Sequence, residues 1–177
     1  MQKFNNNKLI IILGVLFFLI PTLLFALNIQ NWDDSIEETE KETFRVETFA
    51  DGFDIPWGMV FLPNKNLIVS DRNGDLWKIN YNTNEKIQIS GVPNVRYRGQ
   101  GGLLDVQIHP DFINNNYIYI GFTDYLKKKT FTSIVRATLK NNNLINHKII
   151  YKADDKYYSN SSIHYGTRIV FDKEGYL

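Results

Sequence analysis

Short apolar or alternating runs, separated by Asn, Gly, Pro and Asp, fill the chain from residue 44 onward. Runs of this kind with these separators are typical of β-strands. No stretch of this part sustains the 3.6-residue period of a helix for three turns. The fold class predicted for residues 44–177 is therefore all-β. The pattern predicts nine strands and no helix: Phe44–Phe49, Trp57–Leu62, Leu67–Asp71, Leu76–Asn80, Leu103–Ile108, Tyr117–Thr123, Ser133–Leu139, Lys148–Tyr151 and Thr167–Phe171.

The strands also form a repeat, in which two apolar strands are joined by a turn. Val60–Val69 contains the unit with a Pro-Asn turn, and Val106–Ile120 contains it with a longer turn. Phe61 lies 47 residues before Ile108, which lies 62 residues before Val170 in a third copy. The first spacing suits a four-stranded propeller blade of roughly 40–50 residues, and the second suits a blade with an inserted loop. We expect two blades and the start of a third.

The third copy of the repeat begins at Arg168 and stops at Leu177, two residues into its second strand. A sheet edge left at this point would expose unpaired backbone groups. We therefore expect the chain to be the amino-terminal fragment of a longer protein, and to be inactive alone.

The first 27 residues have a different pattern. Lys3 and Lys8 precede a charge-free apolar run from Leu9 to Leu27. As a helix this run would span roughly 28 Å at about 1.5 Å per residue, close to the thickness of the bilayer core. Residues 1–27 are predicted to form an N-terminal hydrophobic helix, either a cleaved signal peptide or a retained signal-anchor transmembrane helix. Both interpretations direct the chain to a membrane.

Charge predicts the orientation of the chain. Residues 28–43 are predicted to be a solvated acidic linker. From the end of the apolar run to Glu47, the chain has seven acidic residues and two basic ones. Because both Lys3 and Lys8 precede the apolar run, the positive-inside tendency places the N-terminus in the cytoplasm and the remainder outside. We expect an exported domain on the periplasmic or extracellular side, either released or anchored in the inner membrane through residues 9–27.

Composition excludes several classes of function. The net charge is +1, and no basic patch is interleaved with aromatic residues, so no nucleic-acid partner is expected. Lys127–Lys129 is the one lysine run after residue 44 and is predicted to be a solvated hairpin tip. The chain has no cysteine, which excludes a disulfide framework, a thiolate metal site and a cysteine nucleophile.

Three glycines surround Gln100 in the segment Gly99–Gly102, and the apolar run Leu103–Ile108 follows directly. A phosphate-binding loop would require a helix immediately after its glycines. Pro110 lies too close for a helix of more than two turns. The glycine segment is therefore predicted to lead into a strand.

Five segments, in this order, resemble the soluble aldose (glucose/sorbosone) dehydrogenase family: Ile55–Pro63, Ser70–Gly74, Gly99–Phe112, Asn114–Ile120 and His164–Phe171. The similarity runs from about Phe44 to Leu177. Members of this family are six-bladed β-propellers that use pyrroloquinoline quinone (PQQ). The resemblance implies a partial six-bladed propeller and PQQ-dependent oxidation of the anomeric carbon of aldose sugars. It also implies an aldose substrate and an electron acceptor as partners.

Oxidation at an anomeric carbon requires a base for the hydroxyl proton and a cofactor for the hydride, because no protein side chain accepts hydride. Histidine suits the base, since its unperturbed pKa is about 6.5. The chain has three histidines. His109 precedes Pro110 in a predicted turn, and His147 lies in a polar stretch that is predicted to be exposed. His164 ends a long polar loop just before the next blade, and by resemblance it is the catalytic base.

Two further residues are candidates for cofactor binding. Gln100 precedes the equivalent strand of the preceding blade, so its side chain and that of His164 are expected to face one channel. By resemblance Gln100 contacts the cofactor or the substrate, and a packed loop residue is the alternative. Arg168 is a candidate partner for a carboxylate of the quinone, and a structural ion pair between blades is the alternative.

Asp105, Trp57 and Tyr165 are expected to pack or to form hydrogen bonds, and Asp105 needs a partner if it is buried. No metal ligands are assigned, because Asp154 and Asp155 lack the spacing of a calcium loop. By resemblance, the calcium ligands and the remaining basic residues of the quinone site lie in later blades.

Two alternative functions stay open. The first is a non-catalytic extracellular binding propeller, since one fold hosts many functions. The second is a lactonase-type propeller, which would require clustered carboxylates on the strands that line the channel.

Overall fold

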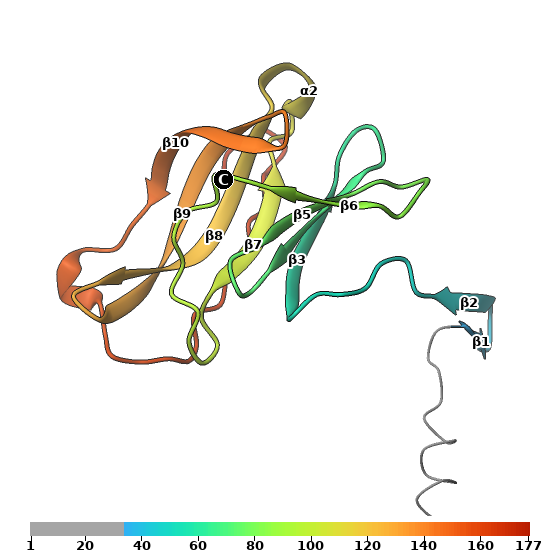
Figure 1. Cartoon of the computed structure of the whole chain (residues 1–177), viewed down its shortest axis with the longest axis horizontal. Helices are drawn as coiled ribbons and strands as arrows, with labels where there is room; N and C mark the ends of the chain where they lie inside the picture. The colour runs from blue at the N-terminus through green and yellow to red at the C-terminus, as the bar shows by residue number, and fades with distance from the viewer. Residues whose placement is uncertain (1–33) are drawn as a thin grey trace, which may run out of the picture. The chain divides into compact units, whose positions relative to one another are not determined.

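The computed structural model describes residues 34–177 (Figure 1). Contacts divide the chain between Phe49 and Ala50 into two compact units, which are described separately. The hydrophobic helix predicted for residues 1–27 lies outside the described residues. Within residues 34–177, no helix is long and apolar enough to cross a membrane.

The described part of the first unit contains an antiparallel hairpin of β1 (Asp34–Glu38) and β2 (Thr43–Glu47). At its turn, the Thr39 hydroxyl accepts a hydrogen bond from the Glu42 N–H at 3.0 Å. β2 confirms the strand predicted at Phe44–Phe49. β1 was not predicted and lies within the stretch expected to be a solvated linker, because a single large apolar residue gives no recognisable alternation.

Two four-stranded antiparallel sheets form most of the second unit (Figure 1). In both sheets the strands neighbour one another in chain order, which confirms the all-β prediction. The first sheet consists of β3 (Pro56–Phe61), β4 (Leu67–Asp71), β5 (Leu76–Ile79) and β6 (Lys86–Ile89). The second consists of β7 (Leu103–Ile108), β8 (Tyr117–Leu126), β9 (Lys129–Lys140) and β10 (Asn143–Tyr151).

One strand and two short helical turns of the second unit were not predicted. β6 was missed, because four residues are too few for the alternation to stand out, although the strand pairs with β5 along its whole length. No helix was expected, yet the structure has a one-turn helix α2 (Phe112–Asn115) and a 3-10 turn η1 (Asp155–Tyr157). α2 begins just after Pro110 and ends at Asn116, whose φ of 54° closes the turn in the left-handed region.

The segment Thr167–Phe171 was predicted to be a strand and is not one. A strand requires a ladder with a neighbour, and none forms along this segment within residues 34–177. Instead the N–H of Ile169, a buried residue, donates to a carboxylate oxygen of Asp105 at 2.7 Å. Of this segment only Ile169 is buried, and its N–H binds Asp105 of β7 in place of a strand neighbour.

The core of the second unit lies where the two sheets meet. Figure 1 shows β3 and β7 side by side, and their contact is close because Gly58 faces Asp105 without a side chain. The Ser70 hydroxyl accepts from the Gly58 N–H at 3.0 Å and also bonds the Leu104 carbonyl of the other sheet. Buried apolar side chains from both sheets form one cluster: Leu62, Ile68, Leu76, Ile89, Leu103, Val106, Phe112, Ile118, Ile120, Phe122, Val135, Ala137 and Leu144.

The other face of β3 is open to solvent in the described structure. Trp57 is 43% exposed, Met59 66% and Phe61 57%. These three alternate positions share one face of the strand. Trp57 was expected to pack or to form a hydrogen bond, and within the second unit its side chain is partly exposed.

Candidate functional site

The glycine segment and the loop that contains His164 lie against each other. The Gln100 N–H donates to the Ser162 carbonyl at 2.8 Å. A Cβ atom on Gly99 would lie only 2.3 Å from that same carbonyl oxygen, and the φ of Gly99 is +59°. Glycine is therefore required at position 99 for the loop to approach this closely.

Gln100 and His164 are joined directly. The side-chain Oε1 of Gln100 accepts a hydrogen bond from the His164 N–H at 2.7 Å, across 64 positions of the chain. His164 has a φ of +64°, a left-handed conformation that is uncommon for a residue with a side chain. The amide of Gln100 thus holds His164 in a strained conformation of the kind that often occurs at functional sites.

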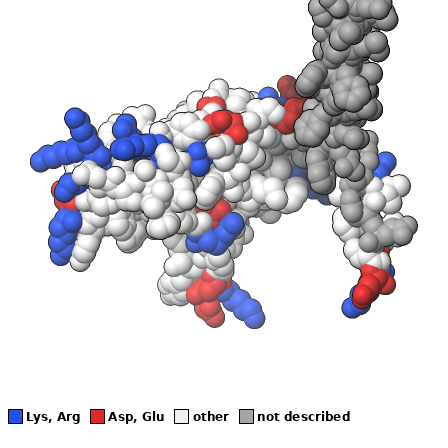
Figure 2. All heavy atoms as spheres, turned by 90° about the horizontal axis from the view of Figure 1, so that it is seen from below, with Lys and Arg blue, Asp and Glu red and all other residues white. Residues whose placement is uncertain are grey.

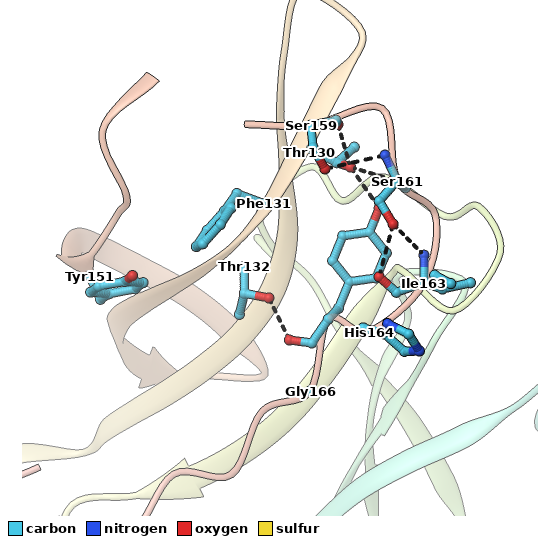
Figure 3. A pocket seen from close by; sticks show the side chains of 10 residues that line it. Thr130, Phe131, Thr132, Tyr151, Ser159, Ser161, Ile163, His164 and Gly166 are labelled. Atoms are coloured by element: carbon cyan, nitrogen blue, oxygen red, sulfur yellow. Dashed lines mark hydrogen bonds between the residues drawn. The ribbon is translucent and has the colours of Figure 1, made fainter. Parts of the chain in front are cut away.

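A pocket of about 340 Å³ lies beside His164, with side chains shown in Figure 3. Its size is within the range of small-molecule sites. Hydroxyl and aromatic side chains dominate its wall. The lining residues are Thr130, Phe131 and Thr132 of β9, Tyr151 of β10, and Ser159, Ser161, Ile163, His164, Tyr165 and Gly166 of the loop.

Tyr165 connects this loop to β9. Its hydroxyl lies 2.6 Å from the Thr130 Oγ1 and donates to the Ser161 carbonyl at 2.7 Å, while its carbonyl accepts from the Thr132 hydroxyl at 2.6 Å. The expectation that Tyr165 forms hydrogen bonds is confirmed. Thr130 and Thr132 were missed as site residues, although two threonines two positions apart at the start of a strand indicate a polar stripe on one face.

Asp105 and Arg168 form an ion pair between β7 and the last segment of the chain. Arg168 donates from Nη1 to Oδ1 of Asp105 at 3.0 Å, and the second carboxylate oxygen accepts a hydrogen bond from the Ile169 N–H. The Asp105 side chain is 2% exposed, so its predicted need for a partner is met. The Arg168 side chain is 71% exposed, which leaves most of its donors open to solvent.

A second cluster holds the start of the same loop. The Tyr158 hydroxyl donates to Asp124 of β8 at 2.7 Å, and Lys152 lies 3.4 Å from that carboxylate. Burial raises the pKa of Tyr158 above its ordinary value, and the hydrogen bond to Asp124 raises it further. The negative charge of Asp124 raises the pKa of Lys152. These contacts hold the start of the loop that contains His164 against the sheet.

The other two histidines lie elsewhere. His109 accepts the Asp111 N–H on Nδ1 at 3.0 Å, and its ring packs edge-on against Phe171, which confirms its role in a turn. His147 is exposed, as predicted, and its Nε2 lies 2.7 Å from the Gly91 carbonyl oxygen. Within residues 34–177, no three His, Cys, Asp or Glu side chains are grouped as metal ligands would be.

Comparison with known proteins identifies the family. The sequence profile of the family Glucose / Sorbosone dehydrogenase matches residues 53–177, and the chain belongs to this family. The chain is 32% identical over 165 residues to the aldose sugar dehydrogenase YliI of Escherichia coli (strain K12), a match that covers 91% of this chain and 42% of that protein. It is also 27% identical to the quinoprotein glucose dehydrogenase B of Acinetobacter calcoaceticus, over 58% of this chain and 22% of that protein.

Solved structures show the same relationship. A crystal structure of a glucose dehydrogenase matches with a TM-score of 0.66 and 31% identity, over 71% of this chain and 37% of that one. The PQQ-bound form of an aldose sugar dehydrogenase from Streptomyces coelicolor matches with a TM-score of 0.55 and 26% identity, over 67% and 34% of the two chains. The chain therefore spans less than half the length of these relatives.

Proposed function

We propose that this chain carries the proton-accepting residue of a PQQ-dependent aldose dehydrogenase, His164. The observation that carries the proposal is the hydrogen bond from the His164 N–H to the Gln100 side chain, beside a pocket rich in hydroxyl groups. Hydroxyl and aromatic side chains are the groups that sugar hydroxyls and ring faces contact. Relatives of this family include proteins named as aldose sugar dehydrogenases, which supports the substrate class.

Gln100 and Arg168 do not line the pocket of about 340 Å³, but both have groups that could donate to the carboxylates of a quinone. Arg168 uses one nitrogen for Asp105 and keeps further donors in solvent. Gln100 uses its Oε1 for His164, and within the described residues its amide nitrogen has no partner. Both groups are therefore free to donate to an anionic or carbonyl oxygen. When bound, PQQ would supply the hydride acceptor that the protein lacks.

The chemistry of His164 follows from its place. No described residue forms a hydrogen bond with its imidazole, so the ring is free to accept the proton of a sugar hydroxyl. Gln100 holds the backbone of His164, and His164 is one of the residues that line the pocket.

The architecture and placement of the protein are part of the proposal. The two sheets would be the first two blades of a six-bladed propeller, with residues 163–177 starting the third; their equal strand order supports this. Calcium ligands and the remaining quinone contacts would lie outside this chain. The apolar run Leu9–Leu27 after Lys3 and Lys8 supports export, with the domain on the periplasmic or extracellular side.

The proposal is tested by substituting histidines in a full-length enzyme. This enzyme contains the residues of this chain and is as long as the relatives. His164→Ala should lower turnover on aldoses by about 10²–10⁴-fold, the usual contribution of a positioned base. Its PQQ affinity, measured by fluorescence titration, should change little. Gln100→Ala should weaken PQQ or sugar binding more than turnover if its amide holds the ligand.

His109→Ala is the matched control, because His109 lies in a turn away from the pocket. It should leave turnover nearly intact. Equal, mild effects of His109→Ala and His164→Ala in the PQQ-loaded enzyme would refute the catalytic role and favour the non-catalytic binding propeller. No observation in residues 34–177 favours the lactonase-type alternative, because the carboxylate cluster that it requires is not formed there.

A further inference from the structure

The turn between β8 and β9 consists of lysines in an unfavourable conformation. Leu126 pairs with Lys129, so Lys127 and Lys128 alone form the turn. Their φ angles are +47° and +73°, both in the left-handed region. Two-residue turns with two positive φ angles strongly favour Asn and Gly, whereas lysine is strained in them. The sequence therefore keeps two lysines here at some expense in stability.

The next turn of the same sheet has the same geometry with favoured residues. Lys140 pairs with Asn143, and the two turn residues Asn141 and Asn142 have φ angles of +51° and +59°. Asparagine is the residue with a side chain that most readily adopts this conformation. The backbone requirement alone thus selects asparagine at one turn and does not explain lysine at the other.

The lysines of the β8–β9 turn are also unpaired. Lys127, Lys128 and Lys129 are all exposed, and no acidic group in residues 34–177 forms an ion pair with them. Other lysines near this end of the sheet do have partners: Lys152 pairs with Asp124 and Lys156 with Asp154. The end of the molecule at the left of Figure 2, where Figure 1 draws the β8–β9 turn, carries mainly basic atoms.

We infer that the β8–β9 turn, with Lys127, Lys128 and the adjoining Lys129 of β9, docks on the surface of an anionic phospholipid bilayer. Each lysine near such a surface strengthens binding about fivefold, and three strengthen it about a hundredfold. Tyr125, which is 49% exposed next to the turn, is the kind of amphipathic side chain that lies at membrane interfaces. A macromolecular anion is the partner that three unpaired ammonium groups fit.

The sequence also indicates why a bilayer is favoured over an acidic protein. The apolar run Leu9–Leu27 is predicted to enter a membrane, and residues 28–49 connect it to the second unit. Attachment of the same chain to the bilayer would make docking of the turn an intramolecular step, which raises the occupancy of weak surface contacts. Because Lys129 precedes the pocket residue Thr130, docking would bring the rim of the pocket near the lipid headgroups.

The chain lacks cysteine, so one introduced cysteine can carry an environment-sensitive dye without competition. The full chain with Leu126→Cys, labelled with NBD, is reconstituted in nanodiscs of phosphatidylglycerol or of phosphatidylcholine. We expect a blue shift of the dye with phosphatidylglycerol only. The shift should be lost at about 0.5 M salt, where the Debye length is well below 8 Å and surface charges are screened.

The decisive variant is Lys127→Asn combined with Lys128→Gly, which supplies the residues that the turn favours. This variant should raise the melting temperature while it abolishes the blue shift. In sedimentation with phosphatidylglycerol vesicles, which does not depend on the dye, its binding should fall about 25-fold for two lost lysines. A solely structural role for the turn cannot combine a gain in stability with a loss of lipid contact.

A charge-matched control adds Asn141→Lys and Asn142→Lys to that variant, which moves the lysines to the other turn. The blue shift at position 126 should stay absent. The inference is overturned by equal dye signals in the two lipids, or by unchanged vesicle binding of the Lys127→Asn, Lys128→Gly variant. The inference would also be overturned if the original chain, and none of its variants, bound to polyglutamate while the dye did not respond to lipid. That result would indicate an acidic protein partner.

Discussion

Strands β3 and β7 hold the same position in their sheets, since each is the first of four strands and lies at one edge. Their sequences are similarly apolar, Pro-Trp-Gly-Met-Val-Phe and Leu-Leu-Asp-Val-Gln-Ile. The first four residues of β7 are all buried, whereas Gly58 is the one fully buried position of β3. The difference arises from contacts outside each strand's own sheet. β7 lies between β3 and the segment around Ile169, whereas β3 contacts β7 on one side.

This comparison shows that burial in the fold is supplied by adjacent sheets and segments rather than by a strand itself. A unit that stacks on its neighbours obtains its core from both of them. Asp105 is the clearest example, because it faces Gly58 on one side and binds Ile169 and Arg168 on the other. The loop that contains His164 is held by separate contacts, those of Gln100 with His164 and of Tyr165 with Thr130 and Thr132.

The largest expected effect tests the two strands directly. Leu104→Ala in β7 removes a side chain with no exposed surface and should lower the free energy of unfolding by about 2–5 kcal/mol. Met59→Ala in β3 removes a side chain that is mostly in solvent, and should cost less than about 1 kcal/mol. Urea unfolding of the full chain measures both. Equal losses would show that β3 is covered in solution.

A smaller effect is expected at the ion pair that covers β7. Asp105→Ala leaves the Ile169 N–H buried without a partner and should cost about 2 kcal/mol. Arg168→Ala should cost less than about 1 kcal/mol, because its guanidinium is largely hydrated. If Arg168→Ala proved the more destabilising of the two, the carboxylate would not be the group that holds the segment.

The smallest effect is a dependence on pH. The folded chain raises the pKa of Tyr158 and that of Lys152, so it favours the protonated form of both groups. Their contribution to stability is complete below their ordinary pKa values of about 10 and is lost as the pH rises through the folded values. Denaturation midpoints between pH 9 and 11, the range of about one unit on either side, should fall with pH. Tyr158→Phe should flatten that fall, and an unchanged slope would contradict the assignment.

The strands illustrate how far the sequence alone leads. Alternation and turn residues located eight of the nine predicted strands, because both depend on nearby residues only. The same criteria missed β6, which is too short. They also placed a strand at Thr167–Phe171, where the structure has no strand and Ile169 alone is buried.

The candidate site divides in the same way. The residue types, the glycines around Gln100 and the resemblance of His164–Phe171 to a family motif were available in the sequence. The wall formed by Thr130, Thr132 and Tyr151 was not, since these residues have no motif and meet His164 only across β9 and β10.

The sequence by itself determined the strand period, the turns, the family and the identities of Gln100 and His164 as candidates. Only the tertiary structure decided which strand faces are covered, that Asp105 holds Arg168, and that Gln100 binds the backbone of His164. The physical reason is distance along the chain. Strand patterns are set by sterics and solvation within a few residues, whereas the Gln100–His164 bond joins positions 64 apart and forms only when the sheet brings two loops together.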